Sequence, residues 1–200
     1  MTASSEKKEQ VKQVRIQSIY KTALHLFALK GYNGVTTDEI TKAAKCSHGL
    51  LYHYFGSKEG LFQSLMDNVI IPNYSAAIKD VDINQKPALA IRELVSACLE
   101  ELKSNNDDFA CSIHILLNMY VQKKYIPKSK EVEKRKKVSS KIFEIIDQGK
   151  EDGCFHDYDT KEMFVALLAM LRGLSYNRVH LGSKAFTCPN IDIVMKVLEK

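Results

Sequence analysis

The segment of residues 36–58 contains three helix-start signals in close succession, and their spacing constrains the fold more than any other feature of the chain. Thr36 and Glu39 have the spacing of a capping box, in which the hydroxyl accepts from a free backbone N–H and the carboxylate reaches back. A helix is therefore predicted to begin directly after Thr36. Ser47 is a second N-cap candidate, and Ser57 is a third. Two short helices joined by about four residues are typical of a helix-turn-helix, which inserts its second helix into a major groove.

Helical angles divide the second short helix, residues 48–55, into two faces. At about 100° per residue, Leu51 and Phe55 lie together and Tyr54 lies nearer to them than to the opposite side, so this face is predicted to pack inward. A glycine on the outward face permits close approach to base edges or phosphate. The helix N-terminus that follows, with Lys58 beside it, is a predicted phosphate site. The outward face has no carboxylate and consists of His48, Gly49, Tyr52 and His53.

This segment resembles the DNA-binding domain of the TetR/AcrR family of bacterial transcription regulators. The family pattern runs loosely G-x-x-x-T-T-x-x-I-A-x-x-A-G-V-S-x-G-x-L-Y-x-Y-F-x-S-K-E-x-L. Three positions depart from it, with Thr41 in place of alanine, Lys45 in place of the turn glycine and Cys46 in place of valine. A non-glycine residue in a left-handed turn costs ~1 kcal/mol, which a packed domain can absorb. The matching residues are Gly31, Tyr32, Thr36, Thr37, Ile40, Ala43, Ala44, Ser47, Gly49, Leu51, Tyr52, Tyr54, Phe55, Ser57, Lys58, Glu59 and Leu61.

The resemblance implies a role for each residue that would meet DNA. Residues expected to hold phosphates are Thr37, Tyr52 and Lys58. Residues expected at or near bases are Asp38, His48, Gly49, His53 and Tyr54. The charge of the chain agrees with this assignment, because residues 1–58 contain nine Lys/Arg against four Asp/Glu, whereas the remainder is balanced.

Helical periodicity without strand alternation predicts an all-α fold of about nine helices. We expect residues 1–58 to form a three-helix DNA-binding unit with a basic N-terminal arm over residues 1–12. Residues 59–200 are expected to form a larger helical domain for ligand binding and dimerisation, with Pro72 disrupting the helix that joins the two. The segment of residues 163–171 is apolar on every side, and such a helix has to be covered all round. A second subunit is the expected cover, so a homodimer is predicted.

Candidate ligand contacts lie on the helices predicted for the larger domain. Aromatic and methionine side chains at helical spacing are more often simply core, and an arginine there is more readily satisfied by Asp or Glu across the subunit interface, so both alternatives stay open. Cys111 and His114 stand three apart without a second pair, which does not match a zinc site, so no metal and no cofactor is expected. No nucleophile elbow, phosphate loop or dinucleotide fingerprint occurs, and no catalytic residue is predicted. The candidates are Phe109, Met119, Tyr120, Met170, Arg172, Tyr176 and Arg178.

The sequence therefore predicts a ligand-responsive transcriptional regulator rather than an enzyme. By the resemblance it is a repressor that a small hydrophobic or amphipathic effector releases from a palindromic operator in double-stranded DNA. The alternative is a DNA-anchored regulator that has no small-molecule ligand and acts through a protein partner. No secretory signal pattern and no apolar run long enough for a bilayer are present, which predicts a cytoplasmic protein without a membrane contact.

Overall fold

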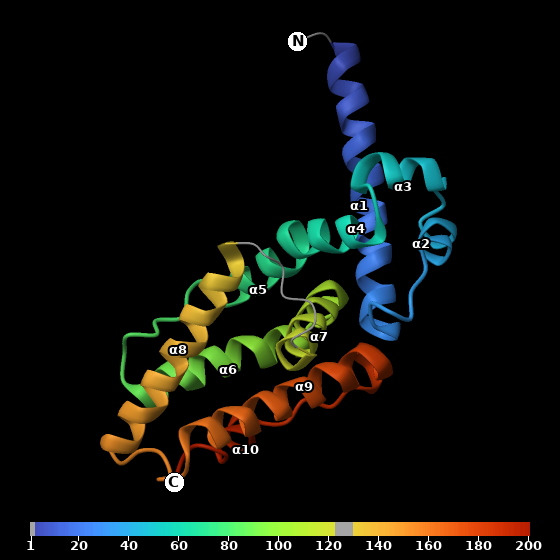
Figure 1. Ribbon diagram of the computed structural model, residues 1–200. Coiled ribbons are helices and arrows are strands. Elements are labelled where there is room, and N and C mark those ends of the chain that lie inside the picture. Colours follow the sequence, from blue (N-terminus) through green and yellow to red (C-terminus); the bar gives the residue numbers. More distant parts are fainter. Residues whose placement is uncertain (1–2, 123–129) are drawn as a thin grey trace. The chain divides into compact units, whose positions relative to one another are not determined.

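The computed structural model describes the backbone of residues 3–122 and 130–200 and the side chains of residues 6–119 and 140–200 (Figure 1). The described residues are helical almost throughout and form no strand, which confirms the predicted all-α class. The elements are α1 (Ala3–Lys30), α2 (Thr37–Ala43), α3 (His48–Phe55), α4 (Lys58–Leu65), the π-helical turn η1 (Met66–Ile70), α5 (Ile71–Ala77), α6 (Pro87–Lys103), α7 (Asp107–Gln122), α8 (Lys130–Glu151), α9 (Thr160–Ala185) and α10 (Ile191–Met195).

The chain divides into two compact units, Met1–Asn73 and Tyr74–Lys200. The sequence places its boundary earlier, at residue 58, yet the first unit continues through α4. The reason is packing, because α4 lies against both α1 and α3. Leu61 and Leu65 of α4 are fully buried, and the Phe62 ring meets the Phe27 ring edge-on at 5.2 Å.

Helix α1 begins at Ala3, so the chain is already helical over most of the segment predicted as an arm. Its side chains from residue 6 to Arg15 are exposed, and its buried face begins near Ile19. The same stripe continues through Ala23 and Phe27, as the sequence predicts. The basic N-terminal segment is therefore an exposed extension of α1 rather than a separate extended arm.

The prediction that Pro72 disrupts the connecting helix is wrong in detail. The change in hydrogen bonding comes earlier, at η1, and Pro72 lies in the first turn of α5. A proline lacks the N–H that a helix interior needs, but a first turn does not use it. The wide π turn shifts the hydrogen-bond register just ahead of the proline, which lets the helical path continue into α5.

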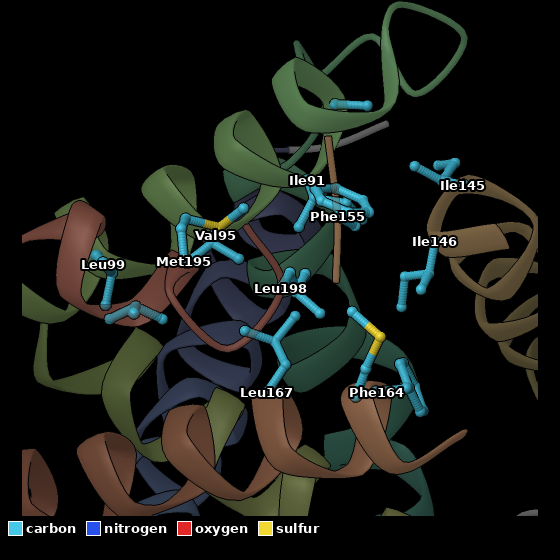
Figure 2. Packing of buried hydrophobic residues seen from close by; sticks show 13 residues of the cluster. Ile91, Val95, Leu99, Ile145, Ile146, Phe155, Phe164, Leu167, Met195 and Leu198 are labelled. Carbon is cyan, nitrogen blue, oxygen red and sulfur yellow. The ribbon is translucent and has the colours of Figure 1, made fainter. Parts of the chain in front are cut away.

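The core of the second unit joins four helices (Figure 2). Ile91, Val95 and Leu99 form the inward stripe of α6, as the sequence predicts, with Pro87 in the first turn of that helix. Phe155 lies in the same cluster and is fully buried. The other members come mainly from α8, α9 and α10 and include Ile145, Ile146, Phe164, Leu167, Met195 and Leu198.

Only one side of the apolar segment of α9 is covered within the second unit. Leu167 is 4% exposed, whereas Val165 is 53% exposed. Ala169 also lies at the surface, so an apolar strip of α9 is open to solvent in the single chain. Among the described residues, no helix is long and apolar enough to cross a membrane.

Candidate DNA-binding surface

Helix α2 is fixed at its start by a reciprocal cap. The Glu39 N–H donates to Thr36 Oγ1 at 3.2 Å, and the Thr36 N–H donates to Glu39 Oε2 at 2.9 Å, which confirms the predicted capping box. Lys30 Nζ donates to Glu39 Oε1 at 2.7 Å. The Lys30 hydrogen bond and the Thr36 N–H lower the pKa of Glu39 to about 2. The carboxylate therefore ties the end of α1 to the start of α2.

The turn between α2 and α3 has the geometry of a helix-turn-helix. Lys45 has a φ of 51°, so this lysine occupies the left-handed position that a glycine would fill at lower cost. The Cys46 N–H donates to the Thr41 carbonyl at 3.0 Å, and the Leu50 N–H donates to Ser47 Oγ at 3.2 Å, which confirms Ser47 as the N-cap. Burial raises the pKa of the Cys46 thiol, which disfavours its reactive thiolate form.

Helix α3 buries one face and leaves the other open, as predicted. Leu51 is fully buried, while Tyr52 is 48% exposed and His53 is exposed. A Cβ placed on Gly49 would meet no heavy atom closer than Ser47 Oγ at 4.0 Å. The described structure therefore has room for a side chain at this glycine. Tyr54 is half-buried between His53 and Phe55, with ring centroids 5.3 and 6.2 Å away, at the edge of the exposed face.

His48 is held at the start of α3 by two residues of α2. Its Nε2 lies 3.2 Å from Thr41 Oγ1 and 3.2 Å from Asp38 Oδ1. The Thr41 hydroxyl is buried and also donates to the Asp38 carbonyl at 3.1 Å. The sequence identified Thr41 as a departure from the family pattern but did not reveal this contact, because it depends on the turn that brings α2 and α3 together.

Lys58 lies at the candidate surface and also makes hydrogen bonds within the chain. Its ammonium donates to the carbonyls of Tyr32 at 3.0 Å and Val35 at 2.8 Å, and it lies 4.3 Å from the centroid of the Tyr32 ring. These bonds tie the loop after α1 to the start of α4, where Ser57 accepts from the Gly60 N–H as predicted. An ammonium has three N–H donors, so one remains for a phosphate.

The candidate ligand contacts of the second unit do not share one environment. Phe109 is buried in a cluster with residues of α6 and α7, and Met119 and Met170 are half-buried. Arg172 and Tyr176 are exposed on α9. The side chain of the remaining aromatic candidate, Tyr120, lies outside the described residues.

Arg178 is 1% exposed and makes three hydrogen bonds within the chain. Its guanidinium donates to the carbonyls of Leu102 and Ser104, each at 3.0 Å, and to Asp107 Oδ1 at 2.7 Å. The acidic partner is therefore the first residue of α7 in the same chain rather than a residue of a second subunit. Arg178 joins α9 to the end of α6 and the start of α7, and the ligand contact expected of it from the sequence stays a prediction.

A buried polar cluster between α7 and α9 was not predicted. His114 is 5% exposed, with Nδ1 3.3 Å from Ser175 Oγ and Nε2 2.9 Å from Asn118 Nδ2. Burial, followed by the nearby His180 and Arg172, lowers the pKa of His114 to about 4. The described residues contain no group of three metal-ligating side chains. Ser175 lies 61 residues from His114 in the sequence, so spacing alone could not reveal the pair.

The capped α2, the left-handed turn and the half-exposed α3 define a helix-turn-helix protein. Comparison with known proteins shows what this segment is similar to. Residues 19–65 match the family described as "Bacterial regulatory proteins, tetR family". The chain is 31% identical over 115 residues to the HTH-type transcriptional regulator YuxN of Bacillus subtilis (strain 168), covering 58% of this chain and 37% of that protein. It is 35% identical over 80 residues to the HTH-type transcriptional repressor NicS of Pseudomonas putida, covering 40% and 37% of the two chains.

A solved structure extends the likeness of fold beyond the aligned segment. The ketosteroid transcriptional regulator KstR2 of Mycobacterium tuberculosis matches with a TM-score of 0.59 and 20% identity, covering 93% of this chain and 95% of that one. The sequence matches to YuxN and NicS each span little more than a third of the relative's length. The match to the tetR family model therefore concerns residues 19–65, which lie within the first unit of the chain.

Proposed function

We propose that the chain is a DNA-binding transcriptional regulator that acts as a homodimer and presents one α3 helix to each half of a palindromic operator. The observation that carries this proposal is the exposed face of α3, which has no carboxylate and is flanked by a fixed turn. His48, Tyr52 and His53 are all exposed there, beside a glycine that packing within the chain does not require. A short helix with polar rings on its open face suits the major groove.

Two kinds of contact divide the work at this surface. Thr37, Tyr52 and Lys58 are proposed to hold phosphates, which sets the register of α3 without reading sequence. Asp38, His48, Gly49, His53 and Tyr54 are proposed to lie at or near base edges. The excess of Lys/Arg in residues 1–58, part of it on the exposed start of α1, supports nonspecific attraction to the backbone.

Selection of duplexes from a random pool with the purified chain tests this proposal. The expected product is an inverted repeat, because a two-fold dimer reads two like half-sites. Competition at ~150 mM salt then compares the selected duplex with scrambled DNA. Enrichment of no sequence, or equal affinity for selected and random duplexes, would remove the basis of the proposal.

The open strip of α9 supports the homodimer. Val165 and Ala169 are exposed in the single chain, although they belong to a segment that is apolar on every side. Leu167 is a poor test position because it lies in the core of its own chain. Val165→Lys is the appropriate variant, with Tyr158→Lys as a control at a residue that is also exposed but precedes α9. Dimers by light scattering for the wild type and the control, and monomers for Val165→Lys, are expected. Monomers of ~23 kDa for the wild type at micromolar concentration would refute the homodimer.

A small hydrophobic or amphipathic effector is proposed to bind among the helices of the second unit and to release the operator by favouring a non-binding state. Half-buried Met119 and Met170 support an adaptable apolar site. The alternative remains a regulator without such a ligand that acts through a protein partner. Thermal unfolding against lipophilic acids, neutral compounds and cationic compounds separates the two. A compound that raises the unfolding temperature and releases operator DNA supports the effector, whereas no binding by any class, or binding without release, favours the alternative.

A further inference from the structure

The contacts of His48 determine which of its two ring nitrogens carries a proton. An ionised carboxylate can only accept hydrogen bonds. Asp38 Oδ1 lies 3.2 Å from Nε2, and a carboxylate at this distance repels the lone pair of a bare nitrogen, which favours a proton on Nε2. Thr41 supports the same assignment, because its hydroxyl hydrogen is directed to the Asp38 carbonyl and its oxygen is left to accept from Nε2 at 3.2 Å.

The other ring nitrogen of His48 then faces a different set of partners. In a neutral imidazole with Nε2–H, Nδ1 is an acceptor. The part of the chain that the structure describes supplies no hydrogen bond to Nδ1, and the His48 side chain is 50% exposed. The ring therefore keeps an unused acceptor on the face that the proposed function brings to DNA.

We infer that Thr41 and Asp38 are positioning residues that lock His48 as an Nε2–H donor toward α2, so that Nδ1 selects a base with an exocyclic amino group. In the major groove such groups are the N4 amino group of cytosine and the N6 amino group of adenine. Guanine and thymine present acceptors at the corresponding place, which an acceptor nitrogen does not favour. The inference rests on the proposed function for its DNA target, but the proton position is a property of the free protein.

Burial explains why Thr41 is suited to this task. The residue is 3% exposed, and a buried hydroxyl without partners is costly. The arrangement satisfies it on both sides, with one hydrogen bond given to the Asp38 carbonyl and one accepted from His48. An alanine, which the family resemblance leads one to expect here, would leave the His48 ring held only by Asp38, whose side chain is 83% exposed.

Nitrogen-15 NMR of the free full-length chain at about pH 8, where a histidine is ordinarily neutral, tests the proton position. His48→Gln identifies the His48 signals. The wild type is expected to show a protonated Nε2 with an observable N–H proton, because the hydrogen bonds slow its exchange with water. Thr41→Ser should retain that proton signal and Thr41→Ala should lose it. A wild-type ring with its proton on Nδ1, or a signal equally strong in Thr41→Ala, would overturn the inference.

Base preference provides the second readout. Selection with the wild type should enrich cytosine or adenine at the position that changes when His48 is replaced by Ala. Thr41→Ala should reduce that preference by about tenfold, the low end for one base contact, while Thr41→Ser keeps it. Affinity for scrambled DNA should be the same for the wild type, Thr41→Ala and Thr41→Ser. This control separates a loss of base preference from a loss of folding. Guanine or thymine at that position would overturn the inference. If the wild type selected no sequence at all, the proposed function would fail while the NMR result remained valid.

Discussion

The two compact units hold a histidine in opposite ways. His48 in the first unit is half exposed and directs Nε2–H toward a carboxylate and a hydroxyl, which leaves Nδ1 open. His114 in the second unit is buried, and both of its nitrogens have partners. Ser175 donates its own hydrogen to the Arg172 carbonyl at 2.9 Å, so its oxygen accepts from His114 Nδ1–H, and Nε2 accepts from the Asn118 amide.

The contrast is between a surface with unused hydrogen-bonding groups and a core whose polar groups have partners within the chain. In the first unit, polar atoms at α3 retain hydrogen-bonding capacity that nothing in the described chain uses. In the second unit, Arg178 and His114 use their donors and acceptors to join helices far apart in sequence. Substitutions at the first kind of residue should change binding with little change in folding, and substitutions at the second kind should do the reverse.

The largest effect on stability is expected from Arg178→Met. The substitution leaves the carbonyls of Leu102 and Ser104 and the Asp107 carboxylate without their donor. This should lower the free energy of unfolding by roughly 3 kcal/mol. Urea unfolding measures the change. Arg172→Met is the matched control on the same helix, because Arg172 is exposed and should change stability by less than about 0.5 kcal/mol. Equal losses in the two variants would contradict the structural role of Arg178.

A pair of glycines tests the contrast with the same added methyl group. A Cβ on Gly149 would lie 2.2 Å from Cδ2 of Phe155, a ring that is fully buried, so Gly149→Ala should cost about 2 kcal/mol. Gly49 has open space, so Gly49→Ala should leave folding unchanged or stabilise α3 by up to ~1 kcal/mol. If α3 approaches DNA closely, the same variant should weaken operator binding. A stable Gly49→Ala protein with undiminished DNA affinity would show that this glycine does not lie against DNA.

Acid should destabilise the second unit through His114. Its pKa is lowered to about 4 in the folded chain, against an ordinary value near 6.5, so the unfolded chain binds the proton more readily. The stability that the neutral, buried imidazole contributes is present above about pH 6.5 and is lost as the pH falls toward 4. Urea unfolding at a series of pH values should show this decline in the wild type and a smaller one in His114→Gln. Identical slopes would mean that His114 does not titrate as its burial requires.

The smallest difference is expected between two phosphate candidates. Lys58→Ala should weaken binding to all duplexes and also cost about 1 kcal/mol of stability, because it breaks the bonds to Tyr32 and Val35. No hydrogen bond of the Tyr52 hydroxyl occurs among the described residues, so Tyr52→Phe should weaken binding without loss of stability. Unfolding and DNA titration on both variants measure the split. A Lys58→Ala protein as stable as the wild type would contradict the stabilising role of the Lys58 hydrogen bonds to Tyr32 and Val35.

Short-range signals account for what could be predicted from the sequence. Thr36 with Glu39, Ser47, and Ser57 each act on a partner three residues away, so the starts of α2, α3 and α4 could be predicted accurately. The exposed and buried faces of α3 followed from the helical period in the same way. Pro87 at the start of α6 is a local signal of the same kind.

Long-range contacts explain what could not be predicted. The partners of Arg178 lie 71 to 76 residues away, and those of Lys58 lie 23 and 26 residues away. Thr41 is only seven residues from His48, but their contact requires the left-handed turn at Lys45. The π turn before Pro72 was not predicted from the sequence either.

The central claim is that the exposed face of α3 reads DNA sequence, and the ratio of affinities for selected and scrambled duplexes tests it most directly. At ~150 mM salt the wild-type chain should prefer the selected duplex by about a thousandfold or more. The double variant His48→Ala, His53→Ala should lose at least about tenfold of that ratio while its affinity for scrambled DNA is retained. A wild-type ratio near one, or a ratio that the double variant leaves unchanged, would contradict the claim.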